Sequence, residues 1–244
     1  GPTDMINRHT QGSPPVALDG RMFIVGRSVV LAYDAYNGTK LWEQSYTGGP
    51  RLRTRTFPGA IVASEKGVFL ATQTECQQFD PATGKILHVC QLPEALKNRR
   101  SKWGYLGLNG KVLVGSISDL LSTNYSKALF AYDVVSKKLL WTYSGKNIAQ
   151  LCMALGGEKS VLINAKMTRW QREAELQKDK TELARLKGEE KRIAEARIKA
   201  ADLQLAVALD LQTGKELWTD ALDLTECTGI HRSHGELMMM YKNG

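Results

Sequence analysis

The stretch that decides the fold is AYDAYNGTKLW, residues 32–42, because it returns three more times along the chain. The other copies are QFDPATGKILH (78–88), AYDVVSKKLLW (131–141) and ALDLQTGKELW (208–218). In every copy, an aspartate is followed at the same spacing by a tryptophan or a histidine. The pairs are Asp34 and Trp42, Asp80 and His88, Asp133 and Trp141, and Asp210 and Trp218. Self-similarity at a steady spacing indicates a repeat architecture.

The period of the repeat points to a propeller. When the charged stretch 167–205 is set aside, the copies recur every 40 to 50 residues or so. Each period reads as four short β-rich segments separated by turn signals such as Asp19-Gly20 and Asn37-Gly38. Four antiparallel strands per repeat, with an aromatic at a fixed place, are typical of a β-propeller blade. We therefore predict an all-β fold, a partial β-propeller of about four to five four-stranded blades.

The predicted blades divide the chain as follows: residues 16–46, 59–91, 103–144 and 148–220, with a partial blade at 226–242. Within the fourth blade, residues 166–204 are rich in helix formers and have Gly188 near their middle. They leave one strand and must return to its neighbour, so we predict an inserted α-helical hairpin. We expect its inner face to bring Met167, Trp170, Ala174, Leu183 and Leu186 against Ile193, Ala196, Ala200 and Leu203.

The recurring residues have a structural explanation. An aspartate before a tight turn can accept hydrogen bonds from the turn amides, and a large ring on the outer strand can pack against the neighbouring blade. We assign this role to seven positions: Asp34, Trp42, Asp80, Asp133, Trp141, Asp210 and Trp218. His88 replaces a tryptophan at the same place, so packing explains it better than catalysis.

The motif apolar-Asp-x-x-Thr-Gly-Lys-x-Leu-Trp resembles the tryptophan-docking repeat of propellers of the pyrroloquinoline quinone (PQQ) type. That family includes the quinoprotein alcohol dehydrogenases and non-catalytic relatives of the BamB type. The resemblance implies the fold and a periplasmic or envelope location. Because such propellers commonly have seven or eight blades, it also implies that this chain is part of a ring. We then expect further blades or self-association to cover the open ends.

Alternating strands divide the connections between two faces, and every long connection falls on one of them. That face carries two basic loops, so it is the predicted working face. The candidate ligand or partner residues are Arg51, Arg53, Arg55, Lys97, Arg99, Arg100, Lys102 and Trp103. They suit an acidic peptide, a phosphate-bearing ligand or a PQQ-like carboxylate, while solvated loop charges remain the simpler interpretation. The net charge of +8 favours acidic partners weakly, and no nucleic-acid-binding module is evident.

Signals for chemistry are sparse. The dehydrogenases that the motif resembles use an adjacent Cys-Cys disulfide, a Ca²⁺ ion and an aspartate base, and this sequence has no Cys-Cys dipeptide. The four cysteines show no metal spacing, although Cys76 and Cys90 flank a predicted hairpin and can be cross-strand neighbours. His231 and His234 form one isolated H-x-x-H pair, a weak metal signal. We predict no catalytic or metal residue, and PQQ with Ca²⁺ enters only through the resemblance.

Two functions follow from these observations. The first is a non-catalytic scaffold that binds a partner protein or anionic ligand through the long-loop face and the helical arm. The second is part of a PQQ-dependent dehydrogenase whose cofactor site lies in blades outside this chain. No apolar run reaches the length of a membrane span, and the first residues show no signal-peptide pattern. The sequence favours the scaffold.

Overall fold

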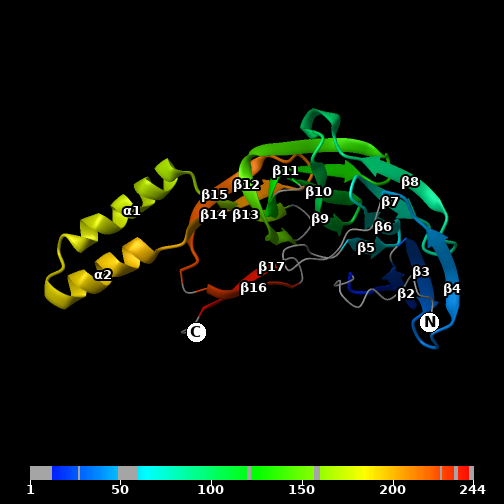
Figure 1. Cartoon of the computed structure of the whole chain (residues 1–244), viewed down its shortest axis with the longest axis horizontal. Coiled ribbons are helices and arrows are strands. Elements are labelled where there is room, and N and C mark those ends of the chain that lie inside the picture. The colour runs from blue at the N-terminus through cyan, green and yellow to red at the C-terminus, as the bar shows by residue number, and fades with distance from the viewer. Residues whose placement is uncertain are drawn as a thin grey trace.

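The structure is a computed structural model that describes residues 13–26, 28–48, 60–119, 122–156, 160–225, 227–233 and 236–241. In these ranges, antiparallel sheets stand side by side around an arc, and a pair of helices projects from one end (Figure 1). This arrangement confirms the predicted partial propeller with blade-like four-stranded sheets.

The first two blades are separate antiparallel sheets whose strands follow sequence order. The first consists of β1 (Val16–Leu18), β2 (Arg21–Val25), β3 (Val29–Asp34) and β4 (Lys40–Ser45). The second consists of β5 (Ile61–Ser64), β6 (Gly67–Ala71), β7 (Glu75–Phe79) and β8 (Ile86–Gln91). Strand β6 is buried along its whole length, as expected for a blade covered on both faces.

The next two repeats share one seven-stranded sheet. Its strands are β9 (Ser101–Asn109), β10 (Val112–Asp119), β11 (Ser122–Asp133), β12 (Lys138–Gly156), β13 (Ser160–Lys166), β14 (Leu203–Asp210) and β15 (Glu216–Asp223). The sequence predicts two strands where β12 runs unbroken for 19 residues. The strand stays extended between the blades because β11 is also long and pairs with it as far as Ala149.

Three hydrophobic clusters hold these sheets together. Phe23 and Trp42 of the first blade pack with Val68 and Phe79 of the second. The second cluster joins β6 to β9 and β10, and the third spans the seven-stranded sheet. Because each cluster draws residues from consecutive repeats, a blade buries its apolar faces only by stacking on its neighbours.

All four repeats form the same tight turn on the face opposite the long loops. In each, one carboxylate oxygen of the aspartate accepts hydrogen bonds from two backbone amides of the turn. In the second repeat, the amides of Ala82 and Thr83 donate to Asp80 Oδ1 at 2.9 and 2.7 Å. The amide of Thr83 contributes most to lowering the pKa of Asp80, and the amide of Ser136 does the same for Asp133. For Asp210, the side-chain hydroxyl of Thr213 lowers the pKa most, followed by the amide of the same residue.

Two tryptophans pack onto the turn of the following blade. Trp42 Nε1 donates a hydrogen bond to the backbone oxygen of Pro81 at 3.0 Å. A β-carbon added to Gly84 would lie only 2.6 Å from the Trp42 ring, so the indole approaches this closely because the turn residue is glycine. Trp141 repeats the arrangement with Leu211, whose oxygen lies 2.8 Å from its Nε1.

The other two repeats depart from this contact. His88 stands in place of the tryptophan, and Lys137, at φ 60°, stands in place of the glycine in the turn that follows. Burial and then the charge of Lys137 lower the pKa of His88. Trp218 is 51% exposed, so the expected packing between blades does not hold for it in the described structure.

The inserted segment forms α1 (Arg169–Leu183) and α2 (Gly188–Ala200) between β13 and β14, and together they make up the arm. Thr168 and Gln171 form a capping box at the start of α1. Neither helix contains a buried residue. The expected inner face is partly wrong, because Trp170 is 80% and Ile193 61% exposed. These side chains point to solvent because the two helices meet along a narrower stripe than the sequence suggests.

A short hairpin follows the fourth blade. Strands β16 (Cys227–Ser233) and β17 (Glu236–Tyr241) pair with each other and contact β12. Elsewhere, Cys76 lies directly opposite Cys90, as the sequence predicts, and both side chains are buried in the core. Burial raises the pKa of the Cys90 thiol to about 11. Within the described residues, no helix has the length and apolar character needed to cross a membrane.

Candidate binding face

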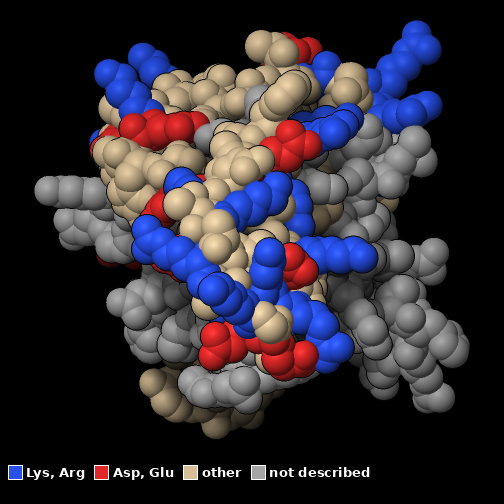
Figure 2. Space-filling model, turned by 90° about the vertical axis from the view of Figure 1, so that its left-hand side faces the viewer, with Lys and Arg blue, Asp and Glu red and all other residues tan. Residues whose placement is uncertain are grey.

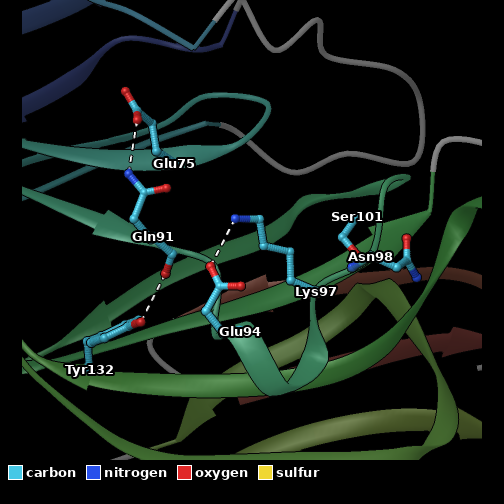
Figure 3. A network of polar contacts seen from close by, with 7 residues as sticks. All are labelled: Glu75, Gln91, Glu94, Lys97, Asn98, Ser101 and Tyr132. Atoms are coloured by element: carbon cyan, nitrogen blue, oxygen red, sulfur yellow. Dashed lines mark hydrogen bonds and ion pairs between the residues drawn. The ribbon is translucent and has the colours of Figure 1, made fainter.

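The long-loop face is built where β7 begins and β8 ends. Gln91, at the end of β8, lies between Glu75 and Tyr132 (Figure 3). Its side-chain amide donates to Glu75 Oε2 at 3.2 Å, while its backbone oxygen accepts from the Tyr132 hydroxyl at 2.9 Å. The bond to Glu75 joins β8 to β7 within the second blade, whereas the bond from Tyr132 of β11 ties the second blade to the third.

Glu75 is the centre of this polar group. Its Oε1 accepts hydrogen bonds from Thr47 Oγ1 at 2.7 Å and from Gln77 Nε2 at 2.6 Å. Burial raises the pKa of the Glu75 carboxyl, but the bonds from Gln77, Thr47 and Gln91 outweigh it, and the net pKa is lowered. Glu75 is therefore an ionised, well-satisfied carboxylate, which suits fixing the face better than exchanging protons.

The connection from β8 to β9 is a short, internally bonded loop. It contains a 3₁₀ turn, Glu94–Leu96, and Lys97 forms an ion pair with Glu94 at 3.0 Å. Asn98 organises the remainder: its Oδ1 accepts from the Arg100 amide at 2.8 Å, and its own amide donates to Ser101 Oγ at 2.9 Å. These bonds hold the backbone beneath the basic residues in one conformation.

The candidate residues of this loop differ in how exposed their side chains are. Lys97, Arg99 and Arg100 are exposed, and Lys102 is partly exposed. The expectation that Trp103 contacts a ligand is wrong, because its side chain is 0% exposed. The ring packs edge-on against Phe130, with ring centroids 4.9 Å apart. The side chain points inward because β9 begins at Ser101 and alternate residues of a strand face opposite sides. Trp103 therefore positions the loop and is not available to a surface ligand.

The other basic loop cannot be placed. Arg51, Arg53 and Arg55 lie outside the described residues, as does His234. The structure adds Glu75, Gln91 and Tyr132, which the sequence reasoning missed. The only sequence signal for Glu75 and Gln91 is a polar residue at a strand end, which is too common to single out a site, and Tyr132 lies within β11 with no such signal.

The arm carries a separate concave feature beside the sheet edge. A groove of about 360 Å³ runs between α1, α2 and strands β14 and β15. Seen end-on, the arm displays many Lys and Arg side chains with acidic groups between them (Figure 2). Among the described residues, no three His, Cys, Asp or Glu side chains are grouped to hold a metal ion.

The family model described as outer membrane protein assembly factor BamB matches residues 7–173, more than half of the chain. The chain belongs to this BamB-type propeller family. Solved propellers agree with that assignment at the level of fold. The structure of BamB from Moraxella catarrhalis shares 9% identity and a TM-score of 0.52, covering 98% of this chain and 66% of that one.

Quinoprotein enzymes show the same architecture. The quinohemoprotein alcohol dehydrogenase ADHIIG from Pseudomonas putida HK5 gives a TM-score of 0.57 at 13% identity, and that from Comamonas testosteroni gives 0.55 at 14%. They cover 96% and 95% of the BamB-type chain, which spans 39% of each enzyme. No curated protein matches the sequence. At these identities the likeness concerns fold alone.

Proposed function

We propose that this BamB-type chain is a non-catalytic binding or assembly scaffold. The partner is a protein or an anionic ligand, and it binds on the face that carries the long basic loops and the arm. On the described part of that face, the contact residues are Lys97, Arg99, Arg100 and Lys102. Arg51, Arg53 and Arg55 extend the same surface in this proposal.

The main support is the construction of the loop from β8 to β9. Arg99 and Arg100 are exposed, yet the backbone beneath them is fixed by Asn98 and Ser101. Because the backbone that carries these cations is already fixed, binding a partner costs less conformational entropy than it would if a mobile loop had to become ordered. Arginine also offers paired donors to carboxylates and phosphates, so this loop suits an acidic partner surface.

The proposed location is the cell envelope. The family model is named for an outer membrane assembly factor, and quinoprotein enzymes share the fold. A scaffold in the envelope would bind its partners through its surface, and long loops held by a rigid fold commonly carry binding residues.

Site-specific crosslinking in the producing cell tests this function. A photoreactive phenylalanine analogue is placed at Arg99 in one variant and, as a matched control, at the fully solvated Tyr36 on the tight-turn face. We expect one protein to crosslink through position 99 and not through position 36. Arg100→Glu added to the first variant should reduce that product about tenfold, because a repulsive pair replaces an attractive one.

Two results would contradict the scaffold. Equal crosslinking from both faces would remove the assignment of the partner to the long-loop face. Saturable binding of PQQ with Ca²⁺, accompanied by alcohol-dependent reduction of a redox dye, would instead establish the dehydrogenase alternative.

A further inference from the structure

The groove of the arm has an apolar floor that the molecule itself covers only in part. Leu183 is the last residue of α1, Leu186 lies in the connection between the helices, and Ala194 and Ile198 come from α2. All four side chains are partly exposed, and neither helix contains a buried residue. A helix pair normally covers such a stripe with another element, so this one resembles a bundle that lacks a helix.

The rim of the groove is acidic. Glu175, Asp179 and Glu182 are four and three residues apart, so they lie along one face of α1. Asp223 extends the acidic row from the end of β15. Arg197 of α2 is the cation that lines the groove. A local excess of carboxylates in a chain of net charge +8 favours an occupant that carries positive charge.

The acidic rim is largely accessible to such an occupant. Asp179 and Glu182 are exposed. Glu175 is engaged by Lys178, whose Nζ lies 2.8 Å from Glu175 Oε2. Asp223 accepts bonds from Thr225. The two exposed acids are therefore the ones that a partner cation would meet first.

We propose that this groove binds an amphipathic helix of a partner protein, with apolar residues on the floor and lysines or arginines along the acidic rim. This is the helix-in-groove mode of recognition. On the side of α1, the groove is lined from Glu175 to Leu186, so about three turns of a partner helix, roughly 16 Å, lie along it. The proposal deepens the scaffold function, on which it rests, and gives the arm its own contact surface.

A second copy of the chain fits the groove less well. Its arm would bring another row made of Glu175, Asp179 and Glu182 to the same contact, with Arg197 as the matching cation of the groove lining. Like charges brought together weaken association, whereas a basic helix removes this conflict.

The test is fluorescence anisotropy with the full 244-residue chain and a labelled 15-residue helical peptide that has leucines on one face and lysines beside them. We expect saturable binding in the micromolar range. The double variant Asp179→Asn with Glu182→Gln should weaken binding about tenfold, because each screened ion pair contributes modestly. The matched control is Glu173→Gln with Glu195→Gln, two exposed acids that do not line the groove, and it should stay within about twofold.

Three results would overturn the proposal. The first is equal weakening by the rim and control variants, which would mean non-specific attraction, and the second is absence of saturable binding. The third is a dimer in sedimentation that Leu186→Lys abolishes, which would assign the groove to a second copy.

Failure of peptide binding with loop-face crosslinking intact would reject the groove alone. Loss of the Arg99 crosslink with peptide binding intact would reject only the loop face.

Discussion

At the residue scale, the contact between indole and glycine is the most specific feature of the repeat. Gly84 and Gly38 have nearly the same φ, +74° and +75°, but only Gly84 has an indole against it. Trp42 can approach because that turn residue has no side chain. The two glycines therefore have the same backbone conformation and differ only in whether an indole ring packs against them.

Substitution by alanine should separate the two effects. Gly38→Ala should cost about 1 kcal/mol of unfolding free energy, the strain of a positive φ. Gly84→Ala should cost about 3 kcal/mol, because the new methyl group also collides with Trp42. Urea denaturation measures both, and equal losses would show that the indole contact does not stabilise the blade junction.

Two substitutions should stabilise the junction between the second and third blades. His88→Trp together with Lys137→Gly recreates the pair seen for Trp42 and Gly84, and removes a lysine from positive φ. We expect a gain of about 1–2 kcal/mol in unfolding free energy from the buried ring and its hydrogen bond. His88→Trp alone should gain little, because Lys137 occupies the space the indole needs. A gain from the single variant as large as from the double would refute this explanation.

The turn aspartates predict a dependence of stability on pH. Asp80, Asp133 and Asp210 have lowered pKa values in the folded state, the first mainly through the amide of Thr83. A carboxyl with a depressed folded pKa stabilises the fold fully above its unfolded pKa of about 3.9. That contribution is lost as the pH falls through the lower folded value. Unfolding free energy should therefore drop between pH 5 and pH 2 or so, and Asp80→Asn should flatten this slope.

At the element scale, the arm is an addition to the sheet rather than a part of its core. Strands β13 and β14 pair from Ser160 and Asp210 up to Lys166 and Gln204, so they are already held together at the base of the arm. Met167 packs against the core, and Ala201 is buried, but neither helix between them contains a buried residue. The helical pattern and the insertion were predictable from the sequence, while the direction of each side chain was not.

Replacing residues 169–200 with a short Gly/Ser linker should therefore leave the propeller folded. Because Met167 and Ala201 remain, we expect the unfolding free energy to change by less than about 1 kcal/mol. Circular dichroism should lose its helical component and keep the β signal. A melting temperature lowered by ten degrees or more would show that the arm supports the blade.

At the scale of the whole molecule, stability should follow the stacking of blades. Strands β6 and β10 lie in clusters shared by consecutive repeats, whereas the arm has no buried residue. Hydrogen exchange should thus protect β6 and β10 most strongly, protect β16 and β17 less because they form a two-stranded sheet, and leave the arm the least protected. Uniform protection across all of them would argue against nearest-neighbour stacking.

The sequence by itself determined the architecture. Strand alternation, the aspartate turns and the recurring ring are local patterns, and the recurrence of residues 32–42 in three further copies predicts the array of blades. The sequence also located the insertion, because a helical stretch interrupts an otherwise regular spacing.

Only the tertiary structure decided which of these residues contact one another. Trp103 belongs to a basic loop in the sequence, but the alternation of β9 turns it into the core. Trp218 has the same local motif as Trp141, yet it is half exposed, because packing depends on the neighbouring blade and not on the motif. The polar group around Glu75 and the groove of the arm combine residues far apart in sequence, and such contacts arise only when strands and helices are brought together in space.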